Sequence, residues 1–519
     1  MWVVAIMVAA SGVAGASAGE GSTTARVVAQ TAHVPVEEST LAAVEQYLET
    51  ARSEIGLPGL AAGIVVGDEV AFVGGFGATA TGVASVGPDT PFLVASLSKS
   101  MTALAVMQLV EDGRVDLDAP VTTYLPELSP GGDGVSVRDL MHHRSGLATL
   151  VGVEPFWEDA LGASLQANVA RLGPSFHADA PHEYSNANYD TLALVVERVS
   201  GIAFASYMQQ HVFEPLGMAN TQLDSATAEQ SGLAAGHYHW LLLGYREHTP
   251  TMPVGMPGSH TVFSSAQDLT HLLIAHLNGG MYRETRVASE ESMETLHEPR
   301  PYGPDTELGY AGGLRVEPSG TPGAPEAFAN YTNIWHDGSS ESYRSVMWMM
   351  PEAGLGFVVL ANGNDLTDES FLPQVARNVK FILAGEQPFE LVGVSDFLTR
   401  WGKHLLLLVV LGQLALAFAT VQPLRRLRRG GTPEKSGWVW LSSATLLDFI
   451  ALALLLFVIP SVGEVPLQAA MTAPDYRILI IGMIIGVTWG LIRTGLVTKW
   501  LYTRRSKPAV EPTSDPAIH

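Results

Sequence analysis

The sequence predicts a mixed α/β protein of the α+β kind, followed by three membrane-spanning helices. Alternating apolar runs at 60–67 and 69–77 meet at a Gly-Asp turn, which is typical of a β-hairpin. Longer apolar stretches, such as 190–213 and 265–280, have the length of buried helices. Beyond about residue 400 the chain becomes much more apolar, and three runs there are each long enough to cross a bilayer.

The first eighteen residues are apolar and end in small residues, which is the pattern of an export signal. Ala16-Ser17-Ala18 resembles an A-x-A cleavage site. Because no Lys or Arg precedes the apolar run, an uncleaved anchor and a wrongly assigned start codon stay open as alternatives. We expect the following segments: a signal peptide at 1–18, a polar linker at 19–38, a soluble domain at 39–386 and a second linker at 387–404.

The charge distribution excludes several classes of function. Residues 1–400 carry 17 Lys and Arg against 46 Asp and Glu, whereas residues 401–519 carry 12 against 6. An acidic surface repels nucleic acid, so DNA and RNA are not expected partners. The absence of cysteine excludes disulfides, thiolate nucleophiles and Cys-ligated zinc. Only Lys99 and Lys380 precede residue 401, so a lysine at the start of a buried helix indicates a function that arginine cannot perform, namely loss of a proton.

The stretch 95–113 is apolar enough to be a buried helix, yet it opens with Ser96 and Lys99. Residues three apart lie on one helix face, so the hydroxyl and the amine are within reach of each other in the first turn. A serine beside an amine whose pKa is lowered by burial is what serine acylation without a histidine base requires. The alternative is a lysine that extends to the surface.

Two further clusters carry polar side chains next to predicted helices or strands. Tyr184 and Asn186 lie in HEYSNANYD, just before a long apolar helix. His336 and Gly338 lie in NIWHDGSSESYRSVMWMM, where a strand-like run follows the glycine. Taken alone, each cluster is commoner as a turn or a helix cap than as a catalytic element.

In this order, Ser-x-x-Lys, Tyr-x-Asn and His-x-Gly resemble the motifs of the serine β-lactamase and penicillin-binding-protein superfamily. The resemblance is specifically to its class C-like branch of DD-peptidases, D-aminopeptidases and esterases, and it covers about residues 40–385. Other stretches agree with it: PDTPFLVASLSKS, GRVDLDAPVTTYLPEL, LMHHRSGL, FEPLGMANTQL and GLGFVVLANG. The resemblance implies a β-lactamase/transpeptidase-like antiparallel sheet flanked by helices, with a helical lobe and the active site between them.

The resemblance also implies a role for each motif residue. Ser96 attacks a carbonyl to form an acyl-enzyme, while Lys99 and Tyr184 share the proton transfers. Asn186 hydrogen-bonds the substrate.

On the strand, Gly338 leaves the edge bare so that substrate lies alongside it. The backbone N–H groups of Ser96 and Ser339 form the oxyanion hole. His336 binds a substrate carboxylate or assists proton transfer. If a neutral His336 is required, activity falls as the pH drops through about 6.5, the usual histidine pKa.

Two positions depart from the family pattern. Class C β-lactamases carry lysine where His336 stands, and a neutral imidazole holds a carboxylate less firmly than an ammonium does, which argues against efficient β-lactamase activity. The family usually has glycine where this chain has Ser342, which predicts a narrower rim of the cleft. Tyr343 and Ser345 fit the pattern again.

The remaining histidines do not predict a metal site. The chain has no H-E-x-x-H motif, and an i,i+5 spacing does not place two imidazoles on one helix face. The histidines concerned are His142, His143, His237, His239, His271 and His276. We expect neither a metal nor a cofactor.

Three apolar runs predict membrane spans at Leu405–Leu424, Trp438–Val462 and Ile478–Tyr502. Basic clusters follow the first and the third run, which places both of these ends in the cytoplasm. The tail 503–519 is then cytoplasmic, and the N-terminal domain lies outside together with the loop 463–477. Buried helices of a soluble domain are the alternative.

Two charged residues within these spans are expected to meet. Asp448 and Arg493 lie about 14 Å in from the cytoplasmic ends of their helices. An intramembrane charge is costly unless paired, so we predict an ion pair between them. Gly482, Gly486 and Gly490 repeat at G-x-x-x-G spacing and predict a face for close helix approach. The alternative is that each charged side chain reaches the interface or a lipid defect.

Taken together, the sequence predicts a multi-pass cell-membrane protein whose extracytoplasmic domain is a serine hydrolase of peptide, amide or ester bonds. D-amino-acid peptides are the first candidate substrate and small esters the second; a carboxylesterase or a weak β-lactamase is the nearest alternative. A non-catalytic penicillin-binding sensor or scaffold is the alternative from another class. The expected partners are a small-molecule or peptide substrate and membrane lipid around the C-terminal helices, and the oligomeric state is not predicted.

Overall fold

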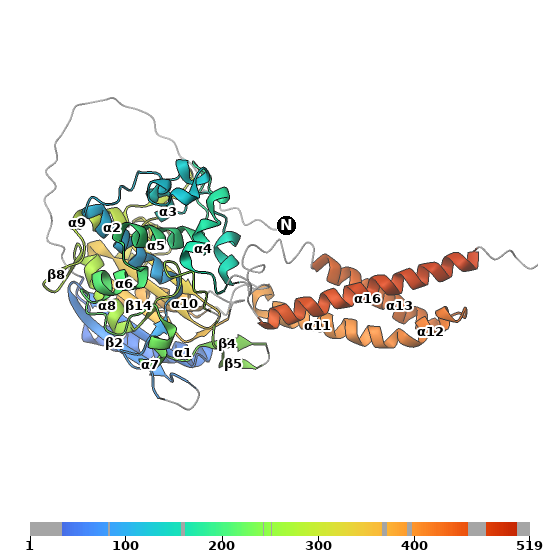
Figure 1. The fold of residues 1–519 in the computed structure, drawn as a ribbon. Helices are drawn as coiled ribbons and strands as arrows, with labels where there is room; N and C mark the ends of the chain where they lie inside the picture. Colours follow the sequence, from blue (N-terminus) through green and yellow to red (C-terminus); the bar gives the residue numbers. More distant parts are fainter. Residues whose placement is uncertain are drawn as a thin grey trace, which may run out of the picture.

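The computed structural model describes residues 34–80, 84–156, 161–241, 243–250, 252–365, 371–391, 397–454 and 474–505. Figure 1 shows a globular part that contains the sheet and an elongated bundle formed by the C-terminal helices. The predicted signal peptide and the last 14 residues of the expected tail lie outside the described residues.

An eight-stranded antiparallel sheet forms the centre of the globular part, in the order β2-β1-β14-β13-β12-β11-β10-β9. Its strands are β1 Gly59–Val66, β2 Glu69–Gly77, β9 Arg300–Pro301, β10 Gly309–Tyr310, β11 Arg315–Glu317, β12 Asn333–Ser339, β13 Arg344–Met350 and β14 Leu355–Ala361. The predicted hairpin is confirmed as β1 and β2, and Gly67 adopts the positive φ that its tight turn requires.

The mixed α/β class with an antiparallel sheet is therefore confirmed. The other strands are short: β3 Phe92–Leu93, β4 His237–Trp240, β5 Gly244–Glu247, β6 Phe263–Ser264, β7 Met281–Tyr282, β8 Thr285–Arg286 and β15 Gly363–Asn364. The helices of the globular part are α1 Glu38–Ile55, α2 Ser98–Glu111, α3 Val137–Met141, α4 Leu165–Ala170, α5 Asn186–Ser200, α6 Phe204–Met208, α7 Ser225–Gln230, α8 Ala266–Leu277, α9 Glu290–His297 and α10 Phe371–Leu383.

Helices cover both faces of the sheet, which explains why β14 reads as one continuous apolar run. Phe357 and Val359 pack with α1 and α10 on one face. Val358 and Leu360 point the other way, toward α8 and the helical lobe that contains α2 and α5. Helices α2, α5 and α8 thus rest on a face whose burial, at roughly 25 cal/mol per Å² of apolar area, stabilises their placement.

The apolar stretch 190–213 does not form one helix. α5 ends at Ser200, and the following Gly201 has a φ of 77°, which suits a left-handed helix cap. The chain then turns by 80° into α6 and a π-helical turn at Gln209–Phe213. Ten consecutive residues of α5, 187–196, are buried in the core of the globular part. This bent pair therefore belongs to the globular part, although it is apolar.

Among the described residues, the C-terminal bundle contains four helices: α11 Phe397–Ala419, α12 Val421–Arg428, α13 Lys435–Ala453 and α16 Pro474–Arg505. Two helical segments, Lys435–Ala453 and Ile478–Thr503, are long and apolar enough to cross a membrane. The α11–α12 pair and the α5–α6 pair pass the same test only as bent spans, so by length and composition the described residues offer two to four candidate spans and do not confirm three. The residues that would complete the second predicted span, 455–462, lie outside the described residues.

The bundle differs from the predicted spans at two helix starts and at one break. α11 begins at Phe397, inside the expected linker 387–404, and α16 begins at Pro474, inside the expected loop. The first predicted span bends by 41° between α11 and α12, where Pro423 has no N–H to donate to the preceding turn.

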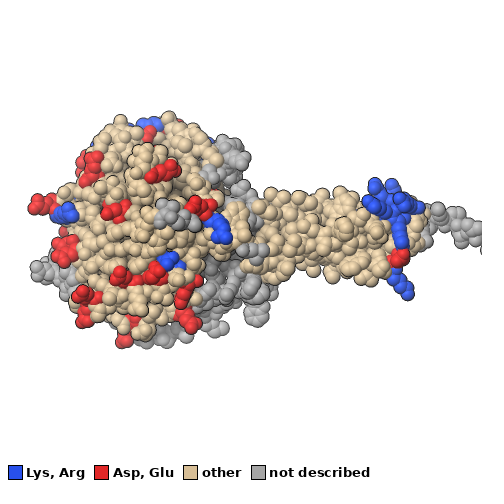
Figure 2. All heavy atoms as spheres, turned by 90° about the horizontal axis from the view of Figure 1, so that it is seen from below, with Lys and Arg blue, Asp and Glu red and all other residues tan. Residues whose placement is uncertain are grey.

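Charged residues are unevenly distributed over the surface. Figure 2 shows acidic side chains scattered over the globular part, a bundle with few charges along most of its length, and Lys and Arg gathered near its far end. The basic residues of the last turn of α12 are Arg425, Arg426 and Arg428. This distribution matches the pattern that the positive-inside rule requires of a membrane-inserted bundle.

The predicted ion pair between Asp448 and Arg493 is confirmed. The Arg493 guanidinium donates to one Asp448 carboxylate oxygen, and the Gln413 amide donates to the other at 3.3 Å. A Cβ on Gly490 would overlap the Asp448 side chain, and one on Gly486 would overlap that of Gln413. The glycine face therefore lets α16 approach α11 and α13 closely enough for the pair to form.

Charge reversal tests the contribution of this pair to the bundle. We expect Asp448→Arg and Arg493→Asp each to reduce the amount of full-length protein in the membrane fraction several-fold, because each leaves two like charges facing each other. The double swap should restore much of it, as measured by quantitative immunoblotting of membranes. A double variant as poor as the worse single variant would contradict a stabilising role for the pair.

Candidate active site

Ser96 lies in a single 3-10 turn, Ala95–Leu97, between β3 and α2. Helix α2 begins at Ser98, so Ser96 precedes the helix and does not open it as the sequence suggested. Ala95 has a φ of 48°, an uncommon left-handed conformation for a residue with a side chain. Of residues 91–107, Ser96 alone is partly exposed, which makes its hydroxyl accessible on an otherwise buried segment.

Lys99 is fully buried, and its amine contacts three oxygen atoms. The Nζ atom lies 3.1 Å from Ser96 Oγ, 2.8 Å from Asn186 Oδ1 and 2.8 Å from the carbonyl oxygen of Ser259. The last two oxygens are acceptors only. In a neutral amine they take its two N–H protons, which leaves the nitrogen lone pair directed at the Ser96 hydroxyl.

The electrostatics favour the neutral amine. Burial lowers the pKa of Lys99 to about 7, against the opposing attraction of the nearby Asp190 carboxylate. Burial also raises the pKa of Asp190, whose Oδ2 accepts a hydrogen bond from Ser259 Oγ at 3.1 Å. Near neutral pH, the site can therefore provide an amine that accepts a proton.

Tyr184 contacts the serine from the other side. Its hydroxyl donates to Ser96 Oγ at 2.9 Å, and its ring lies 4.9 Å from Lys99 Nζ. Burial raises the pKa of Tyr184 well above its usual value. The phenol therefore stays protonated at neutral pH, and it can donate a proton more readily than it can remove one. The structure thus brings Ser96, Lys99 and Tyr184 together.

Two groups that act on the Lys99 amine, the Asp190 carboxylate and the Ser259 carbonyl, were not identified from the sequence. Asn186 opens α5, and Asp190 lies one turn further along the same helix face, an i,i+4 spacing that could have indicated it. The Ser259 carbonyl comes from a loop 160 residues away from Lys99, and no local pattern indicates it.

His336 lies next to these residues but is buried. Its Nε2 atom is 3.1 Å from the Tyr310 hydroxyl, and its ring centroid lies 5.9 Å from that of Tyr184. Burial, with a smaller contribution from Arg315, lowers the pKa of His336 to about 3. The expectation of a histidine titrating near 6.5 is therefore wrong, because the His336 ring lies on the buried side of β12, next to the rings of Tyr184 and Tyr310. The imidazole is therefore neutral throughout the physiological pH range. It does not provide the positive charge that would bind a substrate carboxylate.

Gly338 and Ser339 end β12 beside the 3-10 turn that carries Ser96. A Cβ on Gly338 would overlap the Val94 carbonyl oxygen and Ser345 Oγ, and would lie 3.2 Å from the Ser96 nitrogen. Ser345 Oγ in turn donates to the Val94 carbonyl at 2.7 Å. The two backbone segments expected to form an oxyanion hole are therefore neighbours.

Gly338→Ala tests this close approach. The added methyl group must displace β12 from the turn at 94–96, and a shift of about 1 Å at a catalytic centre costs roughly 10²-fold in rate. We expect kcat/KM to fall by about that factor, and the unfolding temperature to fall as well, because the overlap with the Val94 carbonyl costs about 1–3 kcal/mol. A variant with wild-type kcat/KM would show that the contact is not needed for activity.

The sequence predicts that Ser342 narrows the rim of the cleft. Its side chain is buried, and its Oγ lies 2.9 Å from Nδ1 of His248. A Cβ on Gly236 would lie 2.6 Å from the Ser342 Cβ, so the serine packs tightly against β4 and its neighbours. Tyr343 likewise has a structural contact, because its hydroxyl donates to the Ala234 carbonyl at 2.6 Å.

The other histidines engage local partners. His142 Nδ1 lies 2.8 Å from the Arg138 carbonyl, and His237 Nδ1 lies 3.0 Å from the Asn362 carbonyl. His276 Nδ1 lies 3.0 Å from Nε2 of His297. Within the described ranges, no group of three or more His, Asp or Glu side chains is arranged to hold a metal ion.

Comparison with known proteins agrees with this fold. The family model described as Beta-lactamase matches residues 42–379, so the chain belongs to that family. Protein flp of Staphylococcus aureus strain MW2 is 23% identical over 397 residues, which cover 72% of this chain and 73% of that protein.

Two solved structures share the fold. One is the octameric penicillin-binding protein homologue from Pyrococcus abyssi, with a TM-score of 0.58 and 24% identity over 68% of this chain and 79% of that one. The other is the D-amino acid amidase from Ochrobactrum anthropi SV3 complexed with L-phenylalanine amide, with a TM-score of 0.57 and 22% identity over 67% of this chain and 99% of that one.

Proposed function

We propose that this protein is a membrane-anchored extracytoplasmic serine hydrolase that forms an acyl-enzyme at Ser96. The observation that carries the proposal is the position of Ser96 Oγ, 3.1 Å from the amine of Lys99 and 2.9 Å from the hydroxyl of Tyr184. A partly exposed hydroxyl between a neutral amine and a protonated phenol has a proton acceptor and a proton donor within reach.

In the proposed mechanism, the Lys99 amine takes the proton of Ser96 as Oγ attacks the substrate carbonyl. The negative charge that develops on the carbonyl oxygen is stabilised by the backbone N–H groups of Ser96 and Ser339. Tyr184 gives its proton to the leaving group and is reprotonated from Lys99. Water then attacks the acyl-enzyme, with its proton taken by the same pair of groups, and Ser96 is released.

The pH dependence of kcat/KM tests the assignment of the base. Below pH 7, Lys99 is increasingly an ammonium, and its lone pair is not available. We expect kcat/KM to rise as the pH increases through about 7, and to show no limb from His336, whose pKa is about 3. A His336→Asn variant should keep this limb at the same pH. Loss of the limb in that variant would assign it to the histidine.

The substrates that fit this site best are amides, peptides or esters whose binding does not depend on a carboxylate near the reacting carbonyl. A buried, neutral His336 provides no cation for such a carboxylate. This favours amide and ester hydrolysis over efficient β-lactam hydrolysis. D-amino-acid peptides and amides come first, in line with the fold shared with a D-amino acid amidase, and carboxylesters come second.

The proposed topology has an export signal at 1–18, the hydrolase domain outside, and three helical spans within 405–502. Its support is the apolar surface of the bundle and the arginines at its far end. Alkaline extraction of membranes, combined with protease protection of the globular part, tests this arrangement independently of catalysis. Release into the soluble fraction would contradict it.

Labelling with a fluorophosphonate probe and with fluorescent penicillin tests the enzymatic proposal. We expect covalent labelling of the full-length protein that disappears in Ser96→Ala. A folded protein that neither reagent labels would instead support a non-catalytic sensor or scaffold. Assays with D-amino-acid amides, p-nitrophenyl esters and nitrocefin then compare the candidate substrates directly.

A further inference from the structure

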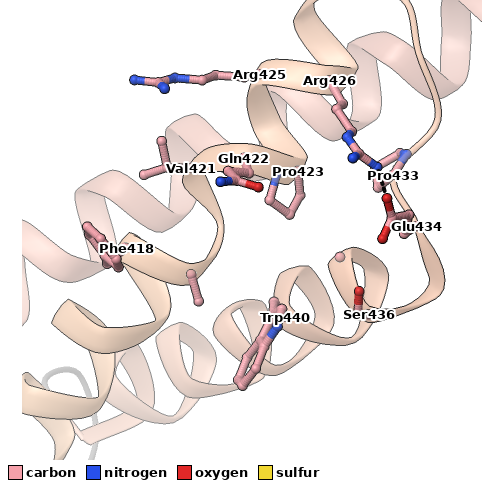
Figure 3. A pocket seen from close by; sticks show the side chains of 12 residues that line it. Phe418, Val421, Gln422, Pro423, Arg425, Arg426, Pro433, Glu434, Ser436 and Trp440 are labelled. Carbon is pink, nitrogen blue, oxygen red and sulfur yellow. Dashed lines mark hydrogen bonds and ion pairs between the residues drawn. The ribbon is translucent and has the colours of Figure 1, made fainter.

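A cavity of about 460 Å³ lies between the bent α11–α12 pair and α13, toward the basic end of the bundle. Figure 3 shows its walls: the bent pair on one side and α13, with Trp440, on the other. The 41° bend at the start of α12 separates these helices locally. The cavity is therefore a consequence of the break near Pro423 and is far from the candidate active site in the sequence and in the fold.

One side of the cavity is lined by apolar side chains that are exposed in the structure. The side chains of Phe418 and Trp440 are 85% and 46% exposed. Phe418 and Val421 line up along one side of the bent pair in Figure 3, and Trp440 lies across from them. If the bundle crosses a membrane as proposed above, lipid acyl chains cover these side chains.

The polar side of the cavity is basic. Arg426 pairs with Glu434 at 2.6 Å, whereas Arg425, which also lines the cavity, has no acidic partner among the described residues. The Gln422 amide lies between the apolar and basic parts. An arginine guanidinium binds phosphate oxygens with two parallel hydrogen bonds, and an unpaired one next to an apolar cavity is suited to an amphiphilic anion.

We propose that this cavity binds one anionic phospholipid. Its phosphate contacts the Arg425 guanidinium and the Gln422 amide, and one acyl chain lies against Phe418, Val421 and Trp440. A zwitterionic lipid is disfavoured because its ammonium group is repelled by the surrounding arginines. The proposal rests on the proposed membrane anchoring and is independent of the hydrolase activity.

Native mass spectrometry of the full-length protein in detergent tests the site. The protein is titrated with phosphatidylglycerol or phosphatidylcholine carrying the same acyl chains. We expect the wild type to retain phosphatidylglycerol preferentially, and Arg425→Gln to reduce this retention about fivefold. Arg428→Gln is the matched control, because it removes the same charge from the same helix at a residue that does not line the cavity; its retention should match the wild type.

Equal losses in Arg425→Gln and Arg428→Gln, or no preference in the wild type, would overturn the proposal in favour of diffuse attraction. Ser436→Leu keeps every charge and fills part of the cavity, so it should also weaken retention of the lipid. Circular dichroism of each variant checks that its helices are kept. Displacement of the lipid by millimolar inorganic phosphate would point to a phosphate site instead of a lipid site. A protein that needs no detergent would contradict the anchoring proposal, whereas one that needs detergent but lacks the preference contradicts only the lipid site.

Discussion

Ser96→Ala is expected to abolish turnover, with kcat/KM lower by at least about 10³-fold on any ester or amide that the wild type cleaves. The substitution removes only the partly exposed Oγ atom, to which the Lys99 amine and the Tyr184 hydroxyl are directed. The chain has no cysteine that could replace it as a thiolate nucleophile. Steady-state kinetics and intact-protein mass measurement of the acyl-enzyme provide two separate readouts.

Ser100→Ala provides the matched control for this substitution. Ser100 lies four residues after Ser96, in the first turn of α2, and its hydroxyl donates to the Leu97 carbonyl at 2.9 Å. We expect this variant to retain most of the activity, and both variants to unfold at temperatures close to that of the wild type. If Ser96→Ala retained acylation at a comparable rate, the nucleophile would have to be assigned to another group.

Lys99→Arg is expected to be nearly as damaging, with a loss of about 10³-fold in kcat/KM. Arginine keeps the positive charge but does not give up its proton at any accessible pH, so it cannot act as the base. The limb of the pH profile near 7 should disappear together with the activity. Comparable activity in Lys99→Arg would exclude the proposed role of the amine.

The larger guanidinium could also disturb the buried site, so a second variant separates folding from catalysis. Lys99→Met matches the lysine side chain closely in volume and removes its charge, which suits a fully buried position. We expect Lys99→Met to fold, as measured by thermal unfolding, and still to be unlabelled by the fluorophosphonate probe. Labelling at the wild-type rate in this variant would again argue against Lys99 as the base.

Several features of the protein could be predicted from the sequence because they depend on short-range periodicity. The three-residue spacing of Ser96 and Lys99 places both on one side of a helical turn, and the alternation at 60–77 predicts the β1–β2 hairpin. The pair of Asp448 and Arg493 could be predicted because helix rise fixes the depth of each residue in its span.

Other predictions failed where the outcome depended on distant parts of the chain. His336 is the clearest example: it is buried and neutral because Tyr310 and Tyr184 lie against its ring, and these neighbours come from distant parts of the chain that the alternation within β12 does not reveal. The bend between α11 and α12 likewise interrupts a run that hydropathy alone shows as continuous.

What the sequence by itself determined is which groups are proposed to react, since Ser96, Lys99 and Tyr184 belong to local motifs whose residue types restrict the chemistry. Only the tertiary structure decided the protonation of Lys99. Its two carbonyl-type partners, on Asn186 and Ser259, lie 87 and 160 residues away along the chain. Desolvation and hydrogen bonding depend on which atoms surround the amine in space, and this is set by the packing of the helical lobe against the sheet.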